Sequence, residues 1–445
     1  MAAVAIYGHG GGPYNHAAIL AAAGHEVSFV FAADIRAGAL ASFDAFVMPG
    51  GGYNSMQGQL DPLGAGGCRA IAEFVGAGGM YIGSCAGSYD AATVPQAFLD
   101  LVPAQAELRL TGATVWNDGA SALGVIQSPG IGELVARNAA PGHPVMAGMP
   151  EEFRITHYNG PLFTSDPGTG DPGTGGAALA TVAAATEKFT PAERFLGGDT
   201  DRLLIDDGIA AGVANIVADE YRDGRVVLFG SHPEFGSGLV MDDVGPAATM
   251  LLNAVDWQLA ARRDVPRAPR APLVAQAPVP AATRAADLAA AGSLVALISA
   301  RAAELAQASH GRPWLAADQA MGMLGASGQQ VWDEALARLP ELAAEAAAGA
   351  PSLPDWALSY RSPDDWQVDG GFWGAVPLLE QAAEMLGEAL ARAAQSFPAA
   401  DGYQHMRQSP YHLVAGSYLA AIGRVAGAAL LVRAFGQPGE GTAAR

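Results

Sequence analysis

A cysteine stands at the end of an apolar run, in a setting that suits a nucleophile. Residues 79–82 read as a short strand, and Gly83-Ser84-Cys85-Ala86-Gly87 follows at once. Small neighbours allow a tight strand-to-helix turn that presents the thiol outward, and the start of a helix lowers its pKa. The pattern indicates covalent catalysis by Cys85. A buried cysteine between a strand and a helix is the alternative.

An imidazole and a carboxylate lie two residues apart after another apolar run. Residues 225–229 read as a strand, and Ser231-His232-Pro233-Glu234 comes directly after it. Residues i and i+2 of an extended chain point the same way. Glu234 can therefore orient His232 while His232 takes the thiol proton. A plain surface turn is the alternative.

A glycine run follows a third apolar run. Pro49-Gly50-Gly51-Gly52 comes after residues 45–48. Without side chains, the backbone N–H of Gly51 can face a developing oxyanion, beside the N–H of Ala86. The alternative is an ordinary flexible loop.

These three loops belong to a repeating pattern of strands and helices. We expect strands at residues 4–7, 27–30, 45–48, 79–82 and 225–229, and helices at about 15–23, 66–76 and 247–261. Such alternation predicts an α/β fold, with helices on both faces of a parallel sheet. Ligands gather at the carboxyl ends of such strands, where all three loops lie.

The second half of the chain has a different composition. Residues 1–261 form the expected α/β domain, and residues 262–283 read as a Pro/Arg-rich linker. Residues 284–436 are Ala-rich and predict a separate α-helical domain, and residues 437–445 form a tail. Its expected helices span about 285–308, 315–324, 329–348, 376–397 and 410–435. The lipid-like stretch 413–435 contains two arginines, which favours a buried helix over a membrane span.

Taken together, the three loops resemble the class I glutamine amidotransferase-like superfamily. The closest resemblance is to the amidotransferase-like domain at the N-terminus of some biotin–protein ligases. It covers roughly residues 1–260 and rests on residues 48–53, 71–89, 158–161 and 231–234. The resemblance implies a flavodoxin-like sheet and a Cys-His-Glu triad.

The resemblance also assigns roles to single residues. Cys85, His232 and Glu234 fall on the triad positions, and Gly51 and Ala86 fall on the oxyanion positions. Glutamine amidotransferases usually carry Gln four residues after the nucleophile, and this chain has Tyr89 there. We therefore expect glutamine to be a poor substrate.

Other polar residues follow the first strand or lie near residue 158. We expect the substrate to contact a set drawn from these loops: Gly50, Gly52, Tyr89, Tyr158, Asn159, His9 and Asn15. Ordinary loop polar groups are the alternative. A metal site built from His9, His16 and His157 lacks any established ligand spacing, so we expect no metal.

Composition excludes several classes of function. The net charge of −20 disfavours nucleic acid, and Lys188 is the only lysine, so the Gly-Lys-Ser/Thr of a Walker A loop is missing. Two cysteines make no disulfide framework, which fits a reducing compartment and a cytoplasmic location. The second cysteine, Cys68, is expected to be a buried small residue. The first residues lack the basic stretch of a signal peptide, and we expect no membrane contact.

The sequence thus predicts a cysteine hydrolase or acyl/amido-transferase that acts on an amide or related acyl bond of a small molecule or peptide. No cofactor is expected. The helical domain is a candidate surface for a homo-oligomer or a partner enzyme. The alternative function is a non-catalytic ligand-binding or assembly module on the same fold.

Overall fold

The structure is a computed structural model that describes most of the chain. It covers residues 1–9, 13–50, 55–116, 129–158, 160–164, 176–191, 193, 203–236, 243–262, 267–311, 328–362, 371–393 and 410–436. Three predicted site residues, Gly51, Gly52 and Asn159, lie outside these ranges. The predicted helix at 315–324 and the tail 437–445 also lie outside them.

Five parallel strands form one half of a ten-stranded sheet within the described ranges. Their order is β2-β1-β3-β4-β10. Their bounds are β1 (Ala3–Tyr7), β2 (Glu26–Val30), β3 (Ala45–Met48), β4 (Met80–Ser84) and β10 (Gly224–Phe229). All five strands were predicted, and apart from Glu26 and Arg225 their residues are apolar or small and buried, as expected when both faces are covered.

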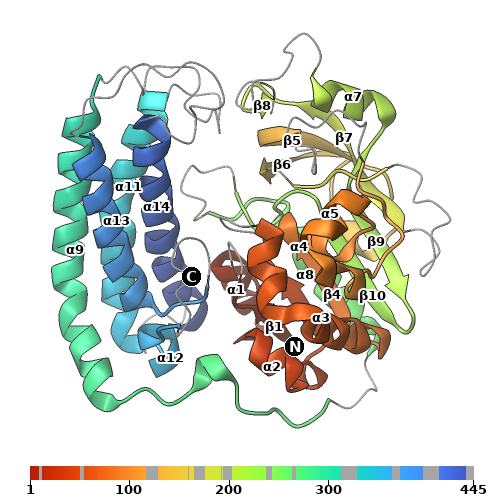
Figure 1. The fold of residues 1–445 in the computed structure, drawn as a ribbon, viewed down its shortest axis with the longest axis horizontal. Coiled ribbons are helices and arrows are strands. Elements are labelled where there is room, and N and C mark those ends of the chain that lie inside the picture. Colours follow the sequence, from red (N-terminus) through yellow and green to blue (C-terminus); the bar gives the residue numbers. More distant parts are fainter. Residues whose placement is uncertain are drawn as a thin grey trace.

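Antiparallel strands extend this sheet beyond β10, which the sequence did not predict. The order continues β9-β7-β5-β6, with β8 paired to β5. Their bounds are β5 (Gly130–Asn138), β6 (Glu152–Tyr158), β7 (Ala177–Ala185), β8 (Thr190–Pro191) and β9 (Ala214–Tyr221). The expectation of a parallel sheet is therefore correct for one half of the sheet and wrong for the other. Figure 1 shows the extension above the parallel part.

Helices cover both faces of the parallel part, as predicted. Val4 and Ile6 of β1 pack with α1 and α8, whereas Ala5 and Tyr7 belong to the core under α3 and α4. The helices of this half are α1 (Pro13–Ala22), α2 (Ala32–Arg36), α3 (Ser55–Gly76), α4 (Ala86–Ala91), α5 (Gln96–Leu101), α7 (Leu204–Ala211) and α8 (Ala248–Ala261).

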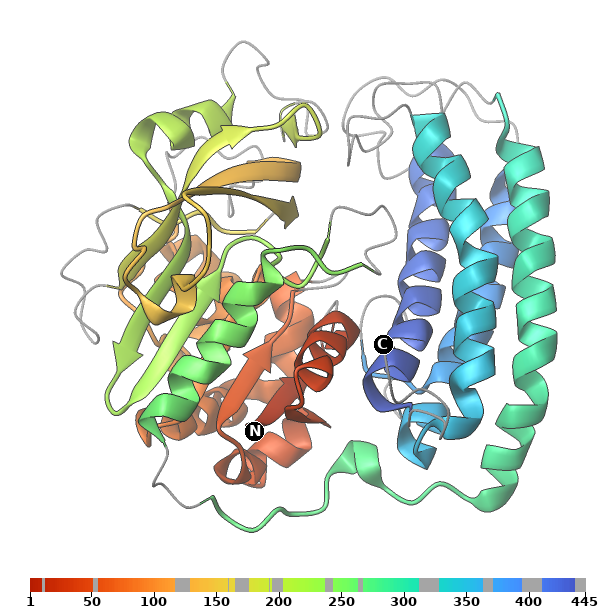
Figure 2. The same cartoon turned by 180° about the vertical axis from the view of Figure 1, so that it is seen from behind.

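The C-terminal part is a set of mostly long helices beside the sheet domain (Figure 2). They are α9 (Ala281–Ser309), α11 (Gly328–Gly349), α12 (Asp355–Ser359), α13 (Ala375–Ala393) and α14 (Pro410–Phe435). Helix α14 lies against α1, and α9 is the outermost (Figure 1). The fold is therefore an α/β domain followed by a helical part, as the sequence predicted.

Aromatic side chains join the two parts. The rings of Phe29 and Phe372 stack with centroids 4.1 Å apart, and Phe372 is fully buried. Its backbone N–H donates to the carbonyl of Gly8 over 2.6 Å. One apolar core consequently runs from the sheet into the helices.

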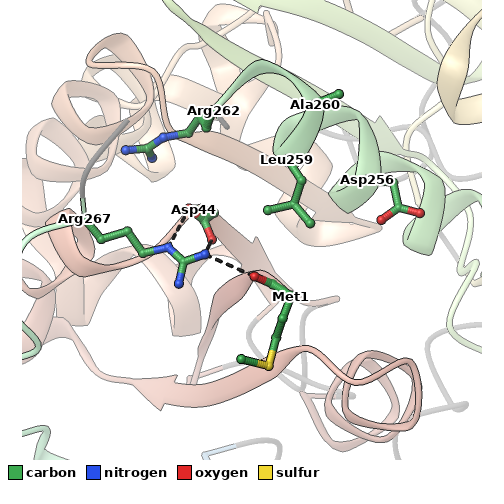
Figure 3. A pocket seen from close by; sticks show the side chains of 7 residues that line it. All are labelled: Met1, Asp44, Asp256, Leu259, Ala260, Arg262 and Arg267. Atoms are coloured by element: carbon green, nitrogen blue, oxygen red, sulfur yellow. Dashed lines mark hydrogen bonds and ion pairs between the residues drawn. The ribbon is translucent and has the colours of Figure 1, made fainter. Parts of the chain in front are cut away.

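The described part of the expected linker lies against the sheet domain. Arg267 contacts Asp44 and the carbonyl of Met1, at the amino ends of β1 and β3 (Figure 3). Arg270 pairs with Glu26, and the N–H of Val274 donates to Asp34 over 2.9 Å. The domain limits themselves stay a prediction.

One helix of the described chain has the length and apolar composition of a membrane span. It is α9, and 22% of its most apolar window is buried. The stretch that the sequence singled out instead lies in α14, where Ala421, Val425 and Leu431 are buried among the other helices.

Candidate functional site

Cys85 occupies a strained turn between β4 and α4. Its backbone angles are φ 51° and ψ −112°, and it is one of two non-glycine residues with positive φ in the described chain. Strain of this kind persists only where the surroundings fix it. The N–H of Cys85 donates to Phe229 of β10 over 2.8 Å, and Ser88 hydroxyl donates to the same carbonyl over 2.7 Å. The turn is thus anchored to the neighbouring strand.

The small residues after Cys85 are required by close packing. A β-carbon on Gly87 would lie 2.2 Å from the carbonyl oxygen of Met48, at the end of β3. Helix α4 can therefore approach the sheet only with glycine at this position, as the sequence pattern indicated. Ala86 is the first residue of α4, and the first N–H groups of a helix have no acceptor within it.

His232 and Glu234 form a buried pair on the loop that leaves β10. His232 Nδ1 lies 2.7 Å from Glu234 Oε1, and Glu234 is fully buried. The N–H of His232 donates to Thr156 of β6 over 2.8 Å, and its ring stacks on Phe235 with centroids 4.5 Å apart. Strand β6 and Phe235 therefore fix the imidazole from two sides.

Gly50 shows that this imidazole faces Cys85. A β-carbon on Gly50 would lie 2.9 Å from His232 Cε1 and 3.4 Å from the β-carbon of Cys85. Both side chains thus flank one point, and no side chain larger than hydrogen fits between them. The carbonyls of Pro49 and Gly50 accept hydrogen bonds from Gln59 over 2.7 and 3.3 Å, which hold this backbone in place.

The electrostatics of the pair favour an imidazolium. Burial by itself lowers the pKa of His232, but the negative charges of Glu234 and Cys85 and the hydrogen bond to Glu234 raise it to about 10. Burial would raise the pKa of Glu234, yet the nearby charges of His16 and His232 lower it. His232 Nε2 is buried, and Cys85 also raises the pKa of this ring through its charge and a hydrogen bond. The nitrogen opposite Glu234 therefore serves the thiol.

The sulfur of Cys85 also has a partner on β6. Cys85 Sγ donates to the carbonyl oxygen of Tyr158 over 3.2 Å, and 8% of Cys85 is exposed. Two residues later, a β-carbon on Gly160 would lie 1.7 Å from the carbonyl oxygen of Gly230 and 3.3 Å from Cys85 Cα. The antiparallel strands missed from the sequence therefore supply one wall of the site.

Two more histidines lie around the pair. His16 Nε2 is 3.1 Å from Ser84 Oγ and 3.7 Å from Glu234 Oε2. His157 Nδ1 is 3.0 Å from Ser231 Oγ, and burial followed by the charge of His232 lowers its pKa to about 3. The sequence grouped both with the polar residues that could line a substrate pocket, and named both as ligands of a metal site that was not expected. His16 was detectable because it follows the first strand, at the same sheet end as Cys85.

The remaining predicted contact residues are more scattered. Asn15 is buried on α1, next to His16. The ring of His9 packs against Tyr7 and Phe31, and its backbone pairs with Gly371 of the helical part. Tyr89 is 2% exposed and stacks on Phe98. Gly50 and Tyr158 thus lie at Cys85 through their backbones, whereas Tyr89 and His9 have rings in aromatic packing.

The described residues contain no group of three His, Cys, Asp or Glu side chains that could hold a metal ion. Both cysteines are free thiols, and Cys68 is buried in α3. What the arrangement can do chemically depends on a thiol, an imidazole and a carboxylate.

Comparison with known proteins gives a fold-level likeness. No protein-family description and no curated protein matches the chain. A cytoplasmic protein of Salmonella typhimurium is 14% identical with a TM-score of 0.35, covering 58% of this chain and 98% of its own. A putative ThuA-like protein of Parabacteroides merdae is 16% identical with a TM-score of 0.35, covering 60% and 92%.

The glutaminase domain of CTP synthase from Trypanosoma brucei is also among the similar structures. It is 14% identical with a TM-score of 0.34, covering 61% of this chain and 97% of its own. At this level of similarity the comparisons carry no information about substrate or catalytic residues.

Proposed function

We propose that this chain is a cysteine hydrolase or acyl/amido-transferase in which Cys85, His232 and Glu234 act together. The observation that carries the proposal is the placement of the His232 ring. One edge of the ring faces the Cys85 β-carbon across Gly50, and Nδ1 of the ring lies at hydrogen-bond distance from Glu234. The three loops that carry these residues also resemble the class I glutamine amidotransferase-like superfamily. The finer resemblance to biotin-ligase-associated domains rests on sequence motifs.

The reaction begins with attack of the Cys85 thiolate on an acyl carbon. A C–S bond forms while the carbonyl π electrons move to the oxygen, and the N–H of Ala86 donates to this oxyanion, with Gly51 as its predicted partner. Collapse of the intermediate expels the leaving group, which takes the proton from His232 Nε2. His232 then removes a proton from water or an acceptor amine, whose attack on the thioester releases Cys85.

Glu234 supports these steps without moving a proton. A buried carboxylate on Nδ1 keeps the other ring nitrogen directed toward the thiol and stabilises the imidazolium. A reducing compartment and a cytoplasmic location, expected from the presence of only two cysteines in the sequence, are part of this proposal.

The substrate is an amide or related acyl compound other than free glutamine. Tyr89 holds the position where the resemblance expects Gln, and its ring is buried against Phe98. No side-chain amide is therefore offered there to a substrate. The helical part, which contacts the Gly8–His9 backbone through Gly371 and Phe372, is the proposed source of further substrate or partner contacts.

Intact-mass analysis tests this function. The full chain is incubated with a panel of thioesters, activated esters and amides, and the adduct is mapped by peptide analysis. We expect an acyl adduct on Cys85 that is absent in Cys85→Ala and forms more slowly in His232→Ala. Without any adduct, or with one that forms equally in His232→Ala, the non-catalytic module becomes the better reading.

A further inference from the structure

The triad carboxylate has an imidazole on each side. Glu234 Oε1 is held by His232, whereas Oε2 is buried and makes no hydrogen bond within the described ranges. A buried carboxylate oxygen without a donor is costly. The nearest cation described for it is His16, whose Nε2 lies 3.7 Å away, with both side chains fully buried.

His16 also touches the strand that ends at the nucleophile. Its Nε2 lies 3.1 Å from Ser84 Oγ, and Ser84 directly precedes Cys85. One imidazole therefore lies between the loop after β4 and the loop after β10. This ring is placed to hold the carboxylate and the nucleophile turn at a fixed separation.

The helix that carries His16 is held by the C-terminal part. Tyr14 precedes His16 by two residues, so the two side chains point to nearly opposite sides of α1. The Tyr14 hydroxyl accepts a hydrogen bond from the N–H of Trp373 over 3.0 Å. A β-carbon on Gly427 of α14 would lie 2.8 Å from the Tyr14 ring. Figure 2 shows α1 between α14 and the sheet.

We propose that His16 is a positioning residue for Glu234, and that docking of α14 on α1 sets its place, so that the helical part governs the reactivity of Cys85. This inference rests on the proposed function. His16 acts on Glu234 Oε2 through its charge at 3.7 Å, without a hydrogen bond, and this attraction keeps the carboxylate from rotating away from His232. Loosening α14 shifts α1 and weakens that restraint.

Several titratable groups surround Glu234 and enter any pH profile. His16 faces it from α1, and His232 lies on its own loop, with Cys85 beyond the imidazole. His157 of β6 acts on His232 from the other side, and Arg424 of α14 acts on Tyr14. The His16 variants retain all the other groups, so a change in the profile traces back to the loss of this one side chain.

The test measures the rate of Cys85 alkylation by iodoacetamide against pH, in the full chain, with peptide mapping. The variants are His16→Leu, which removes the donor, and His16→Gln, which retains an N–H donor at a similar reach. Gly427→Val pushes α14 away from Tyr14. Gly423→Val is its matched control, because it lies one turn away on α14 and a β-carbon there meets nothing within 4 Å.

We expect His16→Leu to lower the alkylation rate of Cys85 at pH 6 by about tenfold. Side chains of one hydrogen-bond or salt-bridge network are coupled strongly enough to produce a change of this size. His16→Gln should retain most of the wild-type alkylation rate. Gly427→Val lowers the rate in the same direction, Gly423→Val does not, and His16→Leu with Gly427→Val together is no slower than His16→Leu alone.

The outcomes separate the two proposals. If His232→Ala slows Cys85 but His16→Leu keeps the wild-type profile, the positioning role is overturned and the proposed function stands. If His232→Ala also keeps the wild-type profile, the proposed function fails. Equal rates for Gly427→Val and Gly423→Val overturn the coupling to α14. The comparison of these two glycine variants tests the coupling to α14 even if His16→Leu does not fold.

Discussion

Glu234 Oε1 lies 2.7 Å from Nδ1 of His232, although only one residue separates them in the chain. Pro233 and Glu234 form a turn after β10, rather than the extended chain expected from the sequence; this turn brings both side chains together, and the backbone bond to Thr156 fixes the loop. Because the carboxylate occupies Nδ1, the other nitrogen of the ring is left for Cys85. This arrangement predicts how much the reaction rate depends on each of the two side chains.

Loss of His232 should cost more than loss of the Glu234 charge. His232 moves the proton, whereas Glu234 orients and stabilises the ring. By analogy with other triads, we expect a fall on the order of 10⁶ in the rate for His232→Ala and on the order of 10⁴ for Glu234→Gln. Single-turnover acylation of Cys85 measures both. A Glu234→Gln enzyme slower than His232→Ala would reverse the assigned roles.

Gly160→Ala should destabilise the protein and disturb the nucleophile turn. A β-carbon there would lie 1.7 Å from the carbonyl oxygen of Gly230, which is backbone and cannot swing aside. We expect the free energy of unfolding to fall by about 3 kcal/mol or more, with a changed alkylation rate at Cys85. Thermal unfolding measures the first effect.

Gly142→Ala is the matched control, because a β-carbon there meets nothing within 4 Å. It should unfold within a few degrees of the wild type. Equal melting temperatures for Gly160→Ala and Gly142→Ala would mean that Gly160 does not approach the carbonyl of Gly230 as closely as described.

Asp90→Asn should stabilise the protein at high pH. Asp90 of α4 is fully buried, and neither carboxyl oxygen has a hydrogen bond within the described chain. Burial raises the pKa of Asp90 well above its usual 3.8. Between pH 3.8 and the raised pKa, the folded state therefore keeps a proton on Asp90 that the unfolded state has lost. The stability that this proton gives is complete below pH 3.8 and is lost as the pH rises through the folded-state pKa.

The asparagine variant avoids that loss because it never ionises. Its free energy of unfolding at pH 8 should exceed that of the wild type by at least about 1 kcal/mol, since one pKa unit is worth about 1.4 kcal/mol. The difference should shrink toward pH 4. Denaturant unfolding at both pH values measures it, with the exposed Asp61→Asn as control. A pH-independent difference would show that Asp90 does not carry the proton.

The parallel half of the fold and its loops could be predicted from the sequence for a physical reason. Strands such as residues 45–48 are buried on both faces, so they appear as short apolar runs that stop at glycine-rich loops. The carboxyl ends of parallel strands meet at one sheet edge. The topology of the sheet alone therefore predicts that Cys85 and His232 lie close together.

The antiparallel half could not be predicted in the same way. Strand β7 reads Ala-Ala-Leu-Ala-Thr-Val-Ala-Ala-Ala, and alanine favours helices rather than strands. The contacts of His16 were also beyond local reasoning, although its position after the first strand put it at the same sheet end as Cys85. It lies in a helix, and its two described partners, Ser84 and Glu234, are far along the chain. Only tertiary packing of α1 brings them into contact.

The alkylation rates of the two thiols at pH 6 test the nucleophile assignment most directly. A thiolate paired with an imidazolium reacts at this pH, whereas an unpaired thiol does not. The pKa of His232 is raised to about 10, so its ring is charged at pH 6. Burial, followed by the charges of Asp90 and Glu107, raises the pKa of Cys68 to about 12. Brief iodoacetamide treatment with peptide mapping gives both rates. We predict fast labelling of Cys85 that slows in His232→Ala, with Cys68 unmodified until the protein unfolds. Faster labelling of Cys68, or a Cys85 rate unaffected by His232→Ala, would contradict the assignment.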